Sequence, residues 1–149
     1  MSRDELAQVV SVYASAQRGE VVIERVVISG HHLRGEDDIW SSYGDALHRS
    51  ELATLATLFP KAAAGVKDLG FSSCNTLTGR ADYRSVKRMF PKLDTVWGYT
   101  GYSPATHTGA IEHMQRWEQA TRDERSRLSG DEADGIRKSD NVRVKNYGR

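Results

Sequence analysis

The sequence predicts an α/β fold in which a small, mostly parallel sheet carries helices on both faces. Stretches with helical spacing of apolar residues alternate along the chain with short runs rich in β-branched and aromatic residues. In addition, Leu58-Phe59-Pro60-Lys61 and Met89-Phe90-Pro91-Lys92 each close a predicted helix and lead into a predicted strand, 31 residues apart. That spacing is the length of one strand-loop-helix unit, so two successive units share one design. Right-handed crossovers between parallel strands are therefore expected.

Each element follows from a local pattern. In chain order, we expect a helix over 2–17, a strand over 21–29, a hairpin or irregular loop over 39–47, a helix over 51–59, a strand from Val66 toward Cys74, a helix over 81–90, a strand over 93–99 and a helix over 109–125. Ser2 with Glu5 forms a capping-box pattern, and Ser50 is expected to cap the second helix. Pro60 and Pro91 are expected to end the helices before them. The residues expected to face inward on the first and last helices are Leu6, Val9, Val10, Tyr13, Ile111, Met114 and Trp117.

Length and composition indicate one globular domain. Of the 149 residues, 1–125 are expected to form the α/β domain and 126–149 a polar extension, in which 141–147 either adds an edge strand or forms a loose tail. A net charge of +1 argues against a dedicated nucleic-acid binder, and no apolar run reaches membrane-spanning length. The N-terminal sequence has no apolar signal-peptide core, which predicts a cytoplasmic location, although signal-independent export fits equally well.

The single cysteine, Cys74, follows an apolar strand and is the centre of the expected site. One cysteine excludes an internal disulfide and fits a reducing compartment or a catalytic thiol. Parallel strands end at one sheet edge, so Cys74 is expected beside Gly30-His31-His32 and Trp97-Gly98-Tyr99, which leave the neighbouring strands. An imidazole in reach of a thiol stabilises the thiolate and later protonates a leaving group. Backbone N–H groups of the turn over 30–34 and of Cys74 are placed to face an oxyanion.

Other interpretations of Cys74 stay open. A lone buried cysteine is often an inert small apolar residue. Residues 74–80 also fit the C-x5-R pattern of cysteine-based phosphatases, with Arg80 as the phosphate ligand and Asp37 or Asp38 as the general acid. A third possibility is a non-catalytic module that recruits a protein partner or joins a larger assembly. The remaining histidines show no spacing that suggests a zinc site, and a thiol with an imidazole base needs no metal and no organic cofactor.

The residues around His31 and Cys74 resemble the two signatures of the caspase-like (clan CD) cysteine peptidases, which include caspases, separases and bacterial CHAT-type proteases. Residues 26–35 match an apolar strand, a small residue and the catalytic histidine, with a glycine shortly after. Residues 71–76 match an apolar strand ending in a small residue and the catalytic cysteine. Residues 95–104 fall where the family places the strand that lines its substrate groove. The resemblance spans about 21–121.

This resemblance implies a caspase-like three-layer sandwich and a cysteine endopeptidase acting on a protein or peptide substrate. By this correspondence, Cys74 is the nucleophile, His31 is the base, and Trp97 and Tyr99 help to line the groove. His32 stands where the family usually has glycine, so His32 remains an alternative base, and with Gly30 it belongs to the oxyanion turn. A catalytically inactive relative that only binds partners has the same signatures.

Overall fold

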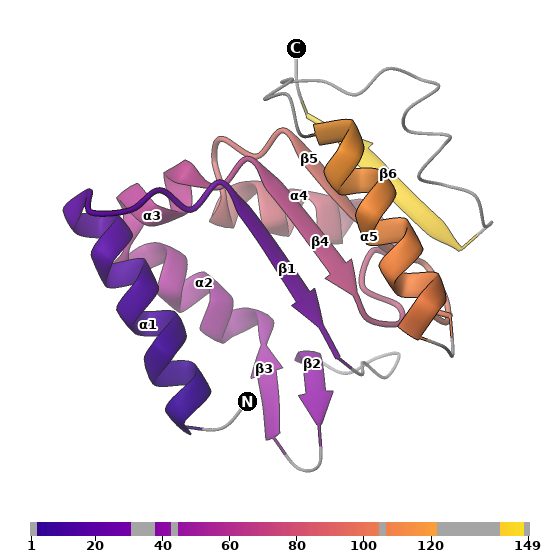
Figure 1. The fold of residues 1–149 in the computed structure, drawn as a ribbon, viewed down its shortest axis with the longest axis horizontal. Helices are drawn as coiled ribbons and strands as arrows, with labels where there is room; N and C mark the ends of the chain where they lie inside the picture. The colour runs from indigo at the N-terminus through magenta and orange to yellow at the C-terminus, as the bar shows by residue number, and fades with distance from the viewer. Residues whose placement is uncertain (1–2, 31–37, 43–44, 105–106, 122–140, 148–149) are drawn as a thin grey trace.

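The computed structural model describes residues 3–30, 38–42, 45–104, 107–121 and 141–147, and these form an α/β fold (Figure 1). An open sheet has the strand order β1-β4-β5-β6. Its first three strands, β1 (Arg25–Ser29), β4 (Asp68–Ser72) and β5 (Thr95–Tyr99), are parallel, whereas β6 (Val142–Asn146) is antiparallel to β5. The predicted α/β class with a small, mostly parallel sheet is therefore confirmed.

Helices cover both faces of this sheet (Figure 1). The remaining elements are α1 (Arg3–Arg18), the hairpin of β2 (Asp38–Ser42) and β3 (Asp45–His48), α2 (Arg49–Leu58), α3 (Pro60–Gly65), α4 (Arg80–Met89) and α5 (His107–Thr121). In Figure 1, α5 lies in front of the sheet and α4 lies behind it. None of the helices in the described ranges is long and apolar enough to cross a membrane.

The alternation of side chains along the strands divides the core in two. On the side of α2, α3 and α4, Leu69, Phe71 and Val96 pack with apolar residues of those helices. On the side of α5, Trp97 and Tyr99 pack with side chains of α5 and β6. Helix α1 joins a third cluster, in which its side chains pack against α2 and α3.

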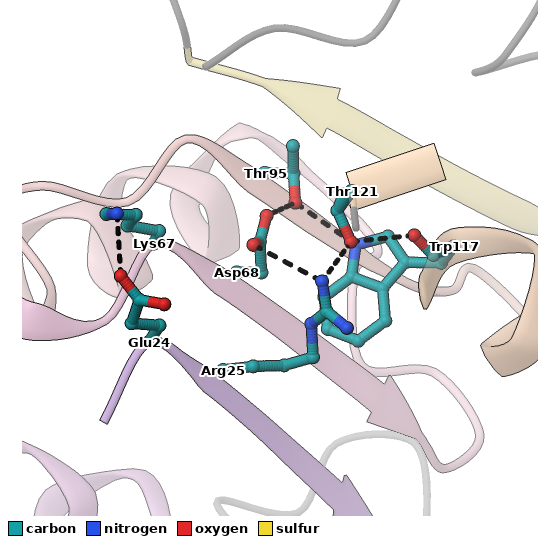
Figure 2. Close-up of polar contacts among 7 residues, drawn as sticks. All are labelled: Glu24, Arg25, Lys67, Asp68, Thr95, Trp117 and Thr121. Atoms are coloured by element: carbon teal, nitrogen blue, oxygen red, sulfur yellow. Dashed lines mark hydrogen bonds and ion pairs between the residues drawn. The ribbon is translucent and has the colours of Figure 1, made fainter. Parts of the chain in front are cut away.

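A buried polar network ties α5 to the amino-terminal ends of the strands (Figure 2). The hydroxyl of Thr95 donates to a carboxylate oxygen of Asp68 and accepts from Trp117 Nε1 at 3.1 Å. Arg25 lies 3.7 Å from the same carboxylate and also donates to the hydroxyl of Thr121. Burial is the largest influence on Asp68 and raises the pKa of its carboxyl group, which the bond from Thr95 and the nearby Arg25 partly oppose.

Several local expectations were wrong. Ser50 lies inside α2, which begins one residue earlier, and the backbone N–H of His48 donates to Glu51 at the helix start. Helix α2 ends before Pro60 as expected, but Pro60 also opens α3, because the first turn of a helix needs no N–H from that residue. Val10 and Ile111 are exposed, since α1 and α5 contact the core along narrower stripes than expected.

The two alternatives for 141–147 are resolved by the pairing of β6 with β5, which makes these residues an edge strand. The backbone N–H of Thr100 donates to the carbonyl of Asn141 at 2.8 Å, and that of Tyr147 donates to the carbonyl of Asp94 at 2.6 Å. Both ends of the strand are therefore fixed to the sheet.

Candidate active site

Cys74 lies in the turn that follows β4, between the carboxyl-terminal ends of β1 and β5. Its side chain is partly exposed. The backbone N–H of Ser103 donates to Cys74 Sγ at 3.2 Å, and the Ser103 hydroxyl lies 3.3 Å from the same sulfur atom. Ser103 belongs to the loop after β5, so two neighbouring strand ends hold the thiol.

The turn that carries Cys74 is fixed against β5. The backbone N–H of Asn75 donates to the carbonyl of Gly101 at 2.8 Å, and that of Leu77 donates to the carbonyl of Tyr99 at 3.1 Å. Asn75 has a φ of 53°, a left-handed conformation that asparagine tolerates better than most residues. Gly98 permits the close approach, because a Cβ there would lie 2.7 Å from Thr76 Oγ1.

The end of β1 leads to the expected base. Ser29 is paired with Ser72 in the parallel register, so β1 and β4 end at the same level of the sheet. Gly30 follows Ser29 directly, as Ser73 follows Ser72. The histidines His31 and His32 lie outside the described residues. The structure therefore brings Gly30 and Cys74 to one sheet edge.

Trp97 and Tyr99 do not line an open groove, which corrects the sequence expectation. Both side chains are fully buried, because β5 is an inner strand and α5 covers this face. Trp97 packs so closely over Gly70 that a Cβ there would lie 2.5 Å from its Nε1. Tyr99 instead directs its hydroxyl to His113 Nδ1, at 2.7 Å. Both residues belong to the core beneath the site.

The pair of Tyr99 and His113 was missed by sequence reasoning. Burial raises the pKa of Tyr99, and the nearby charge of Cys74 raises it further. Burial also lowers the pKa of His113, with Arg116 contributing in the same direction. Both effects favour a neutral pair under the site. The available signal was the spacing of four residues between His113 and Trp117, which places both on the buried face of α5.

The turn does not have the geometry of a phosphate-binding loop, which argues against the C-x5-R interpretation. The N–H groups of Thr78 and Gly79 both donate to the carboxylate of Asp82. The N–H groups of Asn75 and Leu77 donate to backbone carbonyls at the end of β5 and in the loop that follows it. These amides therefore cannot cradle a phosphoryl group beside Cys74. Arg80 is exposed at the start of α4, where it lines a different groove.

Comparison of the chain with known protein families, with curated proteins and with solved structures found no match. Within the described ranges, no group of three His, Cys, Asp or Glu side chains is placed to hold a metal ion. The chemistry available on the described part of this sheet edge is that of the thiol and its hydrogen-bond donors.

Proposed function

We propose that the chain is a cysteine peptidase of caspase-like type, with a protein or peptide as its substrate. The observation that carries this proposal is the position of Cys74 at the end of the central parallel strand, beside the strand end that continues into His31. The thiol is partly exposed and already accepts an N–H from Ser103. A nucleophile needs access to its substrate and a fixed orientation, and these two observations supply both.

In the proposed reaction, His31 takes the proton of the Cys74 thiol, and the sulfur attacks the carbonyl carbon of the scissile peptide bond. Backbone N–H groups of Cys74 and of the turn containing Gly30 and His32 stabilise the resulting oxyanion. The C–N bond then breaks, and the leaving amine takes the proton from His31. Water, deprotonated by the same imidazole, hydrolyses the thioester and restores the thiol. No metal or organic cofactor enters these steps.

The first test is the rate at which iodoacetamide alkylates Cys74, measured against pH in the wild type, His31→Ala and His32→Ala. We expect rapid alkylation of the wild type at neutral pH and a large loss of rate in His31→Ala. His32→Ala should retain most of the rate, because His32 occupies the usual glycine position. Arg80→Ala is the control for the phosphatase alternative and should leave the rate unchanged.

The second test is turnover of a peptide library. Cys74→Ala should abolish cleavage while leaving the circular dichroism spectrum and thermal unfolding intact. General-base catalysis contributes about 10²–10⁴-fold, so His31→Ala should lose activity on that order. If all variants alkylate equally slowly and no peptide is cleaved, Cys74 is a structural residue and the chain is a binding module.

A further inference from the structure

A second surface, which shares no lining residue with the thiol site, lies between α4 and β6. It is a groove of about 790 Å³ that is lined by seven residues. Five of its lining side chains are basic: Arg80, Arg84, Lys87, Arg88 and Lys145. Tyr83 and Tyr147 complete the lining. We refer to this surface as the basic groove.

Four of the five cations of the basic groove are available to a carboxylate ligand. In the part of the chain that the structure describes, no carboxylate forms an ion pair with Arg80, Arg84, Arg88 or Lys145. The three arginines are exposed and follow one another at intervals of four residues on α4, so their Cα atoms are about 6 Å apart along the helix axis. The whole chain carries +1, so removing the five groove cations leaves a net charge of −4. Five of the 21 Lys and Arg residues of the chain therefore line one groove.

The floor of the basic groove is fixed in position. The Tyr147 hydroxyl donates to the carbonyl of Tyr83 at 2.6 Å, and Lys87 Nζ donates to the carbonyl of Leu93 at 2.7 Å. Lys87 Nζ also lies 5.2 Å from the centre of the Tyr147 ring, and Lys145 Nζ lies 6.0 Å from it. These contacts orient two of the cations before any ligand arrives, which lowers the entropy lost on binding.

The internal repeat offers a helix for comparison in which three of these positions are uncharged. The repeat offset of 31 residues aligns Arg84, Lys87 and Arg88 of α4 with Ala53, Ala56 and Thr57 of α2. Helix α2 packs on the same side of the sheet as α4 and contributes to the same apolar cluster without these charges. Lys87 and Arg88 lie in the last turn of α4, where cations also favour the helix, so Arg84 is the groove cation that helix formation explains least.

We propose that the basic groove binds an acidic segment of a partner protein. Guanidinium groups pair with carboxylates through two parallel hydrogen bonds, and the unpaired arginines offer three such forks. A nucleic acid is a poorer fit, because single strands bind by stacking bases on open aromatic rings. Here the Tyr147 ring is approached by two lysines, and the sequence pI of about 7.9 lies below that of typical nucleic-acid-binding domains.

The test is fluorescence anisotropy with a fluorescein-labelled oligoglutamate peptide, at low and at physiological salt. The groove variant replaces each residue by its repeat equivalent: Arg84→Ala, Lys87→Ala and Arg88→Thr. The control variant makes the same change in net charge at residues that do not line the groove: Arg18→Ala, Lys61→Ala and Lys92→Ala. Circular dichroism and thermal unfolding establish that both variants are folded. Cys74→Ala is measured in parallel and should bind as the wild type does, because this proposal does not depend on catalysis.

We expect the groove variant to bind about tenfold more weakly at low salt, the sum of three partly screened ion pairs, and the control variant to bind nearly as the wild type does. Added salt should weaken wild-type binding more than that of the groove variant. Equal losses in both variants, or no wild-type binding, would overturn the proposal. Stronger competition by an oligothymidylate of equal charge than by unlabelled oligoglutamate would also overturn it in favour of a nucleic-acid ligand.

Discussion

Two charge pairs sit next to each other at the amino-terminal ends of β1 and β4, yet we expect them to differ in their effect on stability (Figure 2). Arg25 and Asp68 are register partners with side chains 30% and 12% exposed. Glu24 and Lys67, one residue earlier on each chain segment, are 47% and 38% exposed, with their charged atoms 2.7 Å apart. The second pair has the shorter distance, but the first pair is the one embedded in a network.

We predict that Asp68→Ala lowers the free energy of unfolding by about 2 kcal/mol. It removes a charged acceptor from the buried Thr95 hydroxyl, a loss of about 1.5–3 kcal/mol. Loss of the ion pair with the partly exposed Arg25 adds less than about 1 kcal/mol to this loss. Part of the total is offset, because the variant no longer has to bury a carboxylate. For a chain of this length the melting temperature should fall by about 4–8 °C.

Urea denaturation and thermal unfolding of Asp68→Ala, Arg25→Ala and the double variant measure the loss and the coupling between the two residues. The matched cycle uses Glu24→Ala and Lys67→Ala, for which we expect the free energy of unfolding to fall by less than about 1 kcal/mol. Asp68→Asn should cost less than Asp68→Ala, because the amide oxygen still accepts from Thr95. Equal losses in the two cycles would refute the reasoning, since burial and network membership would then have no effect.

Two further predictions follow from the site. Gly98→Ala should lower the free energy of unfolding by about 1–3 kcal/mol and alter the alkylation rate of Cys74, because the new Cβ would lie 2.7 Å from Thr76 Oγ1. Gly79→Ser is the control: no atom lies within 4 Å of a Cβ there, so the free energy of unfolding and the alkylation rate should both stay unchanged. Burial lowers the pKa of His113 in the folded state, so its contribution to stability is complete above about pH 6.5 and is lost as the pH falls through its folded value. Between about pH 7.5 and about pH 5.5, the free energy of unfolding measured by urea denaturation should therefore fall more for the wild type than for His113→Gln.

The sheet and its topology could be predicted because the pattern of apolar residues was consistent along β1, β4 and β5. Predicted strand starts were too early, as in the run over 21–29, because β-branched residues continue before the point at which β1 pairs with β4. The short helix α3 was missed because proline was interpreted only as a stop signal. The edge strand β6 could not be decided locally, since its pairing with β5 depends on residues far away in the sequence.

The position of Cys74 followed from the rule that parallel strands share one edge. The partner of its thiol, Ser103, was missed although it lies in the loop leaving the next strand, where the same rule applies. The groove role expected for Trp97 and Tyr99 failed for a different reason. Strand position predicts which residues are near an edge, but it does not show which helix will cover them.

The pairing of β6 with β5 also has a consequence for the order of events during synthesis. Strand β6 leaves the ribosome long after β5, and until it does, the side of Trp97 and Tyr99 that packs against Val142 and Val144 stays open. The β1–β4–β5 part can fold earlier, because all three of its strands precede β6 in the chain. A nascent chain held back before residue 142 would therefore expose two large aromatic residues to chaperones, and completion of β6 would release it.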